Sequence, residues 1–180
     1  VYLNVSPPRA IVMAEPDRFE LHQLDYAQNM AALERIVVLI ERHCAAATRI
    51  ILTVSPVPFQ ATFSEDDVVT ANTYSKSVLR TAAQDYATRN RRVTYIPIYD
   101  SIVNTDPDIA WEPDRIHVDS QVVLLNISNF LSKVLADPGQ RRAAGERAVQ
   151  LKETLTAKAA ASTALLGGVS VASESQPPDF

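Results

Sequence analysis

The chain has 180 residues, enough for one domain with a sizeable core and too few for two ordinary domains. Its 47% hydrophobic and 21% charged residues are typical of globular proteins, and its single cysteine excludes a disulfide framework and a multi-cysteine metal site. With 17 basic against 21 acidic residues and no basic cluster, the chain lacks the charge pattern of a nucleic-acid binder. Its apolar runs are too short for a membrane span, and its first twenty residues do not resemble a signal peptide. We therefore expect a cytoplasmic protein that binds neither nucleic acid nor membrane.

The first half of the chain begins with an irregular region and continues with a helix and a strand. Residues 1–22 mix apolar runs with prolines, which favours irregular structure with short extended pieces. A helix is predicted over 25–44, because apolar residues recur at helical spacing and Asp25 with Gln28 fits a capping box. The β-branched run 49–55, which two prolines follow, predicts a buried strand.

The elements that follow continue the alternation of helix and strand. Apolar spacing predicts a helix from Ala71 through Tyr74 and Ala82 to Tyr86, and residues 92–98 predict a second strand. A third helix follows, with Asp119 or Ser120 as its N-cap and with an apolar stripe made of Val123, Ile127, Phe130 and Val134. This alternation is typical of an α/β fold with a parallel sheet.

The last 45 residues differ from the rest in composition, being rich in Ala, Ser and Thr, and we place a boundary near Pro138. The sequence therefore divides into a domain over 1–135 and an Ala-rich tail over 136–180. A weak apolar stripe through Ala148 and Leu155 predicts a solvated helix over 139–160, and disorder is predicted after about residue 163.

Asp114 and His117 are the strongest candidates for chemistry. A histidine acts as a general base when a carboxylate holds one ring nitrogen and the other faces the nucleophile. We expect the two side chains to lie within hydrogen-bond reach on an open loop before the third helix. A loop-stabilising bond without catalysis is the alternative, and a metal site that includes Asp119 is a third possibility. His22 and His43 are interpreted as structural.

Polar residues in two further stretches are candidates for substrate binding. Ser55 ends the first strand, although a turn-forming serine is the favoured interpretation of it. Asn72, Ser75 and Lys76 open the second helix, where they could bind an anion or a carbonyl oxygen or form a plain polar face. A complete serine-hydrolase site is absent from the sequence, because the first 138 residues contain no glycine for a nucleophile turn or an oxyanion hole.

Several of these stretches, in their order and separations, resemble the carboxyl-terminal half of the GSCFA family, a branch of the SGNH-hydrolase-like proteins. They read ILTVSPVPFQATF, ANTYSKSVLRTAAQDYA, VTYIPIYDSIVN and DRIHVDSQVV. The resemblance implies a three-layer, flavodoxin-like parallel sheet that is incomplete in this chain. It also implies a serine esterase or O-acyltransferase in which Asp114 orients His117, acting on a small-molecule or glycan ester without a cofactor.

The Gly-Ser-Cys-Phe-Ala signature of the family, which would carry the nucleophile, has no counterpart in the 180 residues. We therefore expect the serine to lie upstream of Val1 and the isolated chain to be inactive and marginally stable. A non-catalytic binding or interaction domain on the same fold is the alternative function.

Overall fold

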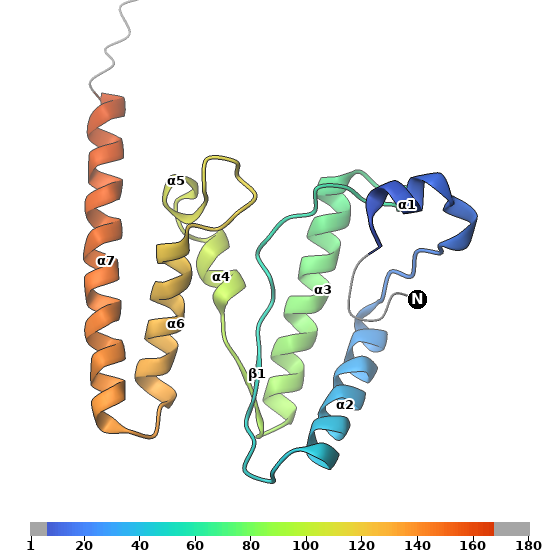
Figure 1. Ribbon diagram of the computed structural model, residues 1–180, viewed down its shortest axis with the longest axis horizontal. Helices are drawn as coiled ribbons and strands as arrows, with labels where there is room; N and C mark the ends of the chain where they lie inside the picture. The colour runs from blue at the N-terminus through green and yellow to red at the C-terminus, as the bar shows by residue number, and fades with distance from the viewer. Residues whose placement is uncertain (1–6, 168–180) are drawn as a thin grey trace, which may run out of the picture. The chain divides into compact units, whose positions relative to one another are not determined.

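A computed structural model describes residues 7–167 of the protein, with side chains as far as Ala161. The chain divides into two compact units (Figure 1). Unit 1 comprises the residues up to Ile50 together with Phe59–Thr94, and unit 2 comprises Ile51–Pro58 together with the residues from Tyr95 on. None of the helices within residues 7–167 has the length and apolar character that crossing a membrane requires.

The strands β1 (Ile50–Leu52) and β2 (Val93–Tyr95) form a two-stranded parallel sheet. Helix α3 (Val68–Arg89) connects them, so the predicted α/β alternation is confirmed at this level. The Ile50 N–H donates to the Arg92 carbonyl at 2.8 Å, and the Ile96 N–H donates to the Leu52 carbonyl at 2.8 Å. Both strands are shorter than predicted. The Ile98 N–H, which would be the next donor to β1 in this register, donates instead to the Ile96 carbonyl at 2.8 Å, and Pro97 is the N-cap of the next helix.

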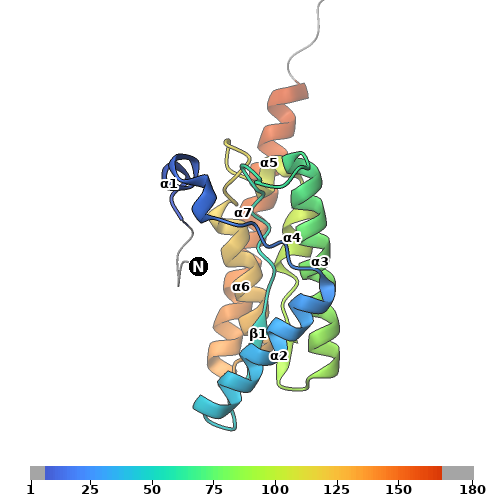
Figure 2. The same cartoon turned by 90° about the vertical axis from the view of Figure 1, so that its right-hand side faces the viewer.

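In unit 1, helix α2 (Tyr26–His43) packs against α3 (Figures 1 and 2). The predicted capping box is confirmed: the Gln28 N–H donates to Asp25 at 2.8 Å, and the Asp25 N–H donates to Gln28 at 2.9 Å. Side-chain bonds also join the two helices, since the Tyr86 hydroxyl donates to Glu34 at 2.7 Å. The buried face of α3 includes Ala71, Ala82 and Tyr86 as predicted, whereas Tyr74 is 44% exposed and lies outside it.

The amino-terminal region is more ordered than predicted. It forms α1 (Arg9–Ala14) and the 3-10 helix η1 (Pro16–Arg18), whereas the sequence favoured irregular structure. Pro8 is the N-cap of α1 and Pro16 is the first residue of η1. The first residues of a helix need no N–H donor, so proline is compatible with these positions. These two prolines therefore begin helices and do not interrupt them. Residues 1–6, for which the same prediction was made, lie outside the described residues.

Unit 2 contains four helices within the described residues: α4 (Ile98–Val103), α5 (Pro107–Ala110), α6 (Ser120–Val134) and α7 (Pro138–Gly167). Helices α6 and α7 run antiparallel side by side (Figure 1). Their core consists of Ile102, Ala110, Val122 and Leu155, against which Trp111 and Val118 also pack. The sequence did not predict α4 and α5, which are only six and four residues long.

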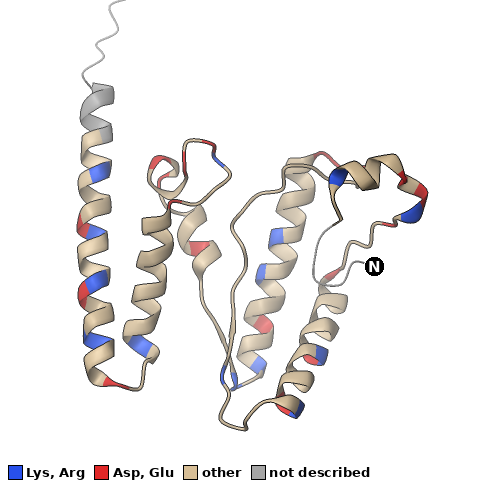
Figure 3. Ribbon diagram, in the orientation of Figure 1, with Lys and Arg blue, Asp and Glu red and all other residues tan. Residues whose placement is uncertain are grey.

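The buried face of α6 differs from the predicted stripe. Val122 and Ser128 are its buried residues, whereas Ile127 is 41% exposed and Val134 is 50% exposed. Lys133 is the single charged residue of α6 (Figure 3), so apolar side chains surround the helix on several sides. Sequence periodicity therefore could not identify the face that α7 covers.

Helix α7 packs against α6 through Ala148 and Leu155, each only 6% exposed, and is thus less solvated than predicted. The predicted disorder concerns mainly residues 168–180, which lie outside the described residues. The predicted boundary at about residue 135 lies at the end of α6.

Candidate functional site

Asp114 and His117 lie on the loop between α5 and α6 of unit 2. The loop is closed at its base by an antiparallel bridge between Trp111 and Val118. The Glu112 N–H donates to the His117 carbonyl at 2.8 Å across the same base. Because the Trp111 and Val118 side chains pack on the core of unit 2, the loop stands on a buried support.

The Asp114 carboxylate uses its two oxygens for different tasks. Oδ1 accepts the backbone N–H groups of Ile116 at 2.9 Å and His117 at 3.0 Å, which fixes the turn. Oδ2 lies 2.5 Å from His117 Nδ1, so the predicted side-chain hydrogen bond is present. The His117 side chain is 71% exposed, and no described residue bonds to its Nε2. The pair therefore presents a free imidazole nitrogen to solvent.

The hydrogen bond shifts both pKa values in the direction of a charged pair. The bond from His117 lowers the pKa of Asp114 to about 2, with help from the two backbone N–H groups. The same bond, and then the negative charge of Asp114, raise the pKa of His117 above its ordinary value of 6.5. When the imidazole is neutral, a carboxylate acceptor at Nδ1 keeps the proton there and leaves the lone pair on Nε2.

The turn that carries the pair includes a residue in a left-handed conformation. Arg115 has a φ of 58°, the one positive φ at a non-glycine residue in the described chain. This conformation costs an ordinary residue about 1 kcal/mol. The Arg115 N–H bond to the Glu112 carbonyl at 2.9 Å and an ion pair with Asp108 of α5 hold it in place.

Asp119, two residues beyond His117, connects the loop to α7. Its side chain caps α6 by accepting the Gln121 N–H at 2.7 Å, and its other oxygen lies 2.6 Å from Lys158 Nζ. Burial raises the pKa of Asp119, but the bonds from Lys158 and Gln121 outweigh this effect and the net shift is downward. Asp119 is thus engaged elsewhere, and within residues 7–167 no three His, Cys, Asp or Glu side chains are placed to hold a metal ion.

The α3 candidates lie in unit 1, around Phe59. Asn72 Oδ1 accepts the Phe59 N–H at 3.1 Å, and Lys76 Nζ lies 5.5 Å from the centre of the Phe59 ring. Lys76 is only 6% exposed, and this burial lowers the pKa of its ammonium group. Ser75 does not join these contacts and faces a neighbouring cavity instead.

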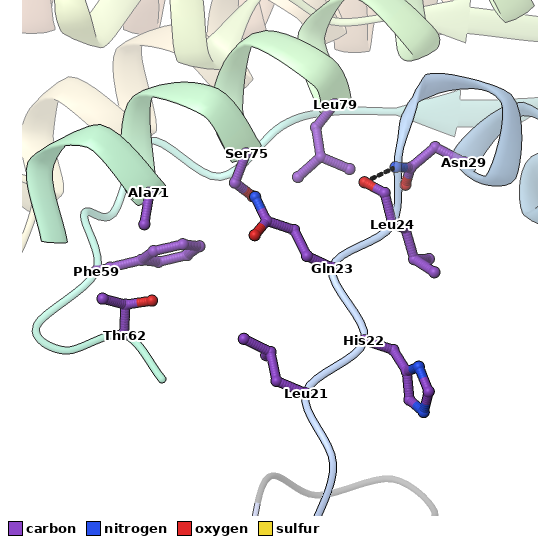
Figure 4. A pocket seen from close by; sticks show the side chains of 10 residues that line it. All are labelled: Leu21, His22, Gln23, Leu24, Asn29, Phe59, Thr62, Ala71, Ser75 and Leu79. Carbon is purple, nitrogen blue, oxygen red and sulfur yellow. Dashed lines mark hydrogen bonds between the residues drawn. The ribbon is translucent and has the colours of Figure 1, made fainter. Parts of the chain in front are cut away.

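This cavity of unit 1 has a volume of about 290 Å³ (Figure 4). Its apolar lining includes Leu21, Phe59 and Leu79, and the Gln23 side chain extends toward Ser75. His22, predicted from the sequence to be structural, also lines the cavity, and its Nε2 lies 3.4 Å from a carboxylate oxygen of Glu20.

Ser55 lies in unit 2 on the segment after β1. Its Oγ accepts the Val57 N–H at 3.3 Å, the bond of a turn-forming serine. The structure thus brings Asp114 together with His117 in unit 2, and Asn72 together with Lys76 around Phe59 in unit 1.

Phe59 and Lys158 also contribute to these clusters, although neither was predicted from the sequence. Phe59 follows the Ser-Pro-Val-Pro stretch, and a large aromatic residue after two prolines was a usable signal. Lys158 is 39 residues from Asp119 on a helix with a weak apolar stripe, so no sequence signal pointed to it.

These features define an α/β protein with a parallel strand–helix–strand unit and an Asp–His pair on a loop before a helix. A family model described as the GSCFA family matches residues 3–130. Because this match covers more than half of the chain, the protein belongs to the GSCFA family, as the sequence resemblance indicated. Neither the curated proteins nor the solved structures contain a match to the chain.

Proposed function

We propose that the chain carries the acid–base half of an SGNH-like serine hydrolase site, in an esterase or O-acyltransferase. The observation that carries this proposal is the 2.5 Å contact between Asp114 and His117 Nδ1, which leaves Nε2 open on a loop that packs on the core. Membership of the GSCFA family supports the same assignment.

In the proposed reaction, His117 Nε2 removes the proton of a serine hydroxyl as the serine oxygen attacks the ester carbonyl. The His117 imidazolium, stabilised by Asp114, then gives this proton to the departing alcohol as the tetrahedral intermediate collapses to an acyl-serine. Water in a hydrolase, or an acceptor hydroxyl in a transferase, releases the acyl group with His117 again as base. The serine itself is assigned to a Gly-Ser-Cys-Phe-Ala segment, which the 180 residues do not contain.

The remaining roles belong to the same proposal. Ser55, Asn72, Ser75 and Lys76 are assigned to substrate binding, and the two-stranded sheet is assigned to a larger three-layer, flavodoxin-like sheet. The tail from residue 136 is assigned to a region outside the hydrolase-like domain, which agrees with a family match that ends at residue 130.

Hydrolysis of p-nitrophenyl acetate by a GSCFA protein that includes both residues 1–180 and the signature segment tests the proposal. Replacing His117 with Ala should lower kcat at least about 10³-fold, because the general base is lost. His43→Ala is the matched control, since His43 is exposed in the last turn of α2. Equal rates for the His117→Ala variant and the parent protein would contradict the proposal.

A non-catalytic binding domain is the second candidate. It is favoured by the two backbone N–H groups that Asp114 Oδ1 accepts, because these bonds give the carboxylate a purely structural use. Serine-directed fluorophosphonate labelling separates the two functions: a hydrolase is labelled, and its His117→Ala variant is labelled far more slowly. A binding domain is not labelled at all.

A further inference from the structure

The feature that carries a further inference is the ammonium group of Lys76. Lys76 is one of three buried polar or charged residues in the described part of the chain, with 6% of its surface exposed. The other two, Asp119 and Ser128, lie on α6 or cap it, and Asp119 has Lys158 as its counter-ion. No described carboxylate pairs with Lys76. Its ammonium group contacts the Phe59 ring in a cation–π interaction instead.

A buried cation without a counter-ion is costly, because desolvation of an ammonium group costs several kcal/mol even after the protein relaxes. The aromatic contact offsets only about 1–2 kcal/mol of that cost. Desolvation alone accounts for the lowered pKa of Lys76, so no acidic neighbour compensates for it. A bound anion would supply the missing charge.

The ammonium group is nevertheless within reach of a small ligand. Arg92 Nε is the single fully buried side-chain nitrogen or oxygen without a hydrogen-bond partner in the described residues. Lys76 Nζ has no hydrogen-bond partner among the described residues either, yet it is not fully buried. It therefore keeps some contact with solvent.

Asn72 supplies a second donor on the same side of α3. It precedes Lys76 by four residues, so the two side chains are neighbours on one helix face. The Phe59 N–H holds Asn72 Oδ1 at 3.1 Å, and this bond fixes which end of the carboxamide is the oxygen. The two hydrogens on Nδ2 have no acceptor among the described residues and are left for a ligand.

We propose that Lys76 and Asn72 form a binding site for a carboxylate group. One positive charge and one amide donor balance a single negative charge, whereas a phosphate dianion would leave an excess charge in a poorly solvated place. The Phe59 ring borders both Lys76 and the 290 Å³ cavity, so the apolar part of the same ligand has a place to lie.

For the reaction proposed above, the substrate class becomes an ester that also bears a free carboxylate. This assignment to the substrate rests on the proposed function, whereas binding of the carboxylate does not. The binding and the catalysis are therefore tested by separate measurements.

The binding test follows the ¹³Cε resonances of lysine in a GSCFA protein that includes residues 1–180 and the signature segment, with ¹³C-lysine labelling and with Lys76→Gln to assign the signal. Sodium acetate is the probe, and sodium chloride at equal ionic strength is the reference. Acetate should shift the Lys76 resonance saturably and raise its pKa, while the exposed Lys133 of α6 stays unchanged. A linear, unsaturable response, or no response, would overturn the proposal and leave Lys76 as a partner of Phe59 only.

Asn72→Asp is the sharpest variant, because it keeps an oxygen for the Phe59 N–H and replaces the donor with a negative charge. It should weaken acetate binding more than about tenfold, since one hydrogen bond to a charged group is worth about a factor of ten. Unchanged acetate affinity in Asn72→Asp would contradict the site, and tighter binding of inorganic phosphate than of acetate would contradict its specificity for carboxylate.

The catalytic arm compares mono-p-nitrophenyl succinate with p-nitrophenyl butyrate. Lys76→Gln should reduce the preference for the succinate ester, expressed as the ratio of the two kcat/KM values, about tenfold. If acetate binds but neither ester is hydrolysed, the carboxylate site stands and the proposed function fails. If both esters are hydrolysed and acetate does not bind, the proposed function stands and the carboxylate site fails.

Discussion

Replacing Asp119 tests whether α7 stabilises the start of α6. The Asp119 side chain is 9% exposed, caps α6 through the Gln121 N–H and pairs with Lys158, whose side chain is 49% exposed. Loss of an N-cap costs about 1 kcal/mol. Loss of a charged pair with one half-exposed partner costs about a further 1 kcal/mol, after allowance for solvent screening. Asp119→Ala should therefore lower the free energy of unfolding by about 2 kcal/mol.

Two variants separate these contributions. Asp119→Asn keeps an acceptor for the Gln121 N–H and loses the charge, so it should cost about 1 kcal/mol. Asp67→Ala is the matched control, because Asp67 is an exposed N-cap of α3 that accepts the Val69 and Thr70 N–H groups without a cationic partner. It should lose the cap and the exposed bond from the Thr70 hydroxyl at 2.6 Å, but no charged pair.

Urea unfolding of a GSCFA protein that includes residues 1–180 and the signature segment gives these free energies, and hydrogen exchange of the first turn of α6 shows whether the loss is local. A double-mutant cycle with Lys158→Met should give a coupling of about 1 kcal/mol. The reasoning is refuted if Asp119→Ala costs no more than Asp119→Asn, or if the cycle gives no coupling.

The remaining predictions concern pH, helix α7 and the isolated chain. Because Asp114 raises the pKa of His117, Asp114→Asn should lower the pKa of His117 toward 6.5 in an NMR titration. The acid limb of the kcat/KM profile should also move to lower pH, because His117 acts as a base only when it is neutral. The pair's contribution to stability is fully present below pH 6.5 on the histidine side and is lost as pH rises through the raised pKa. On the carboxylate side it is present above pH 3.8 and is lost as pH falls toward 2. If Asp114→Asn left the fall in stability above pH 6.5 and below pH 3.8 unchanged, this would argue against the pair. Gly145→Ala should stabilise α7 by about 1 kcal/mol, because the new Cβ meets Ser132 Cβ at an ordinary 3.8 Å, and a loss of thermal stability would contradict this. Residues 1–180 alone should aggregate or bind a hydrophobic dye, because large apolar side chains such as Val69 (69% exposed) and Phe63 (56% exposed) remain uncovered; a sharp two-state transition of a monomer would refute this.

The sequence by itself determined the features that depend on neighbours along the chain. The capping box of Asp25 and Gln28, the N-cap Asp119 and the alternation of helix and strand all follow from local spacing and turn chemistry. The hydrogen bond between Asp114 and His117 belongs to the same class, because a three-residue separation on a turn brings the side chains together without help from distant residues. For this reason the candidate dyad was predictable before the fold was known.

Only the tertiary structure decided the features that depend on distant residues. Apolar residues occupy most positions of α6, and packing against α7 determined that Val122 and Ser128 are buried there. Lys158 pairs with Asp119, which is 39 residues away in the sequence. Lys76 is buried beside Phe59, which is 17 positions earlier in the chain. Helical and strand periodicity describe which residues share a face, but burial depends on what covers that face. The sequence therefore placed Lys76 on a polar helix opening, and the fold made it a buried cation.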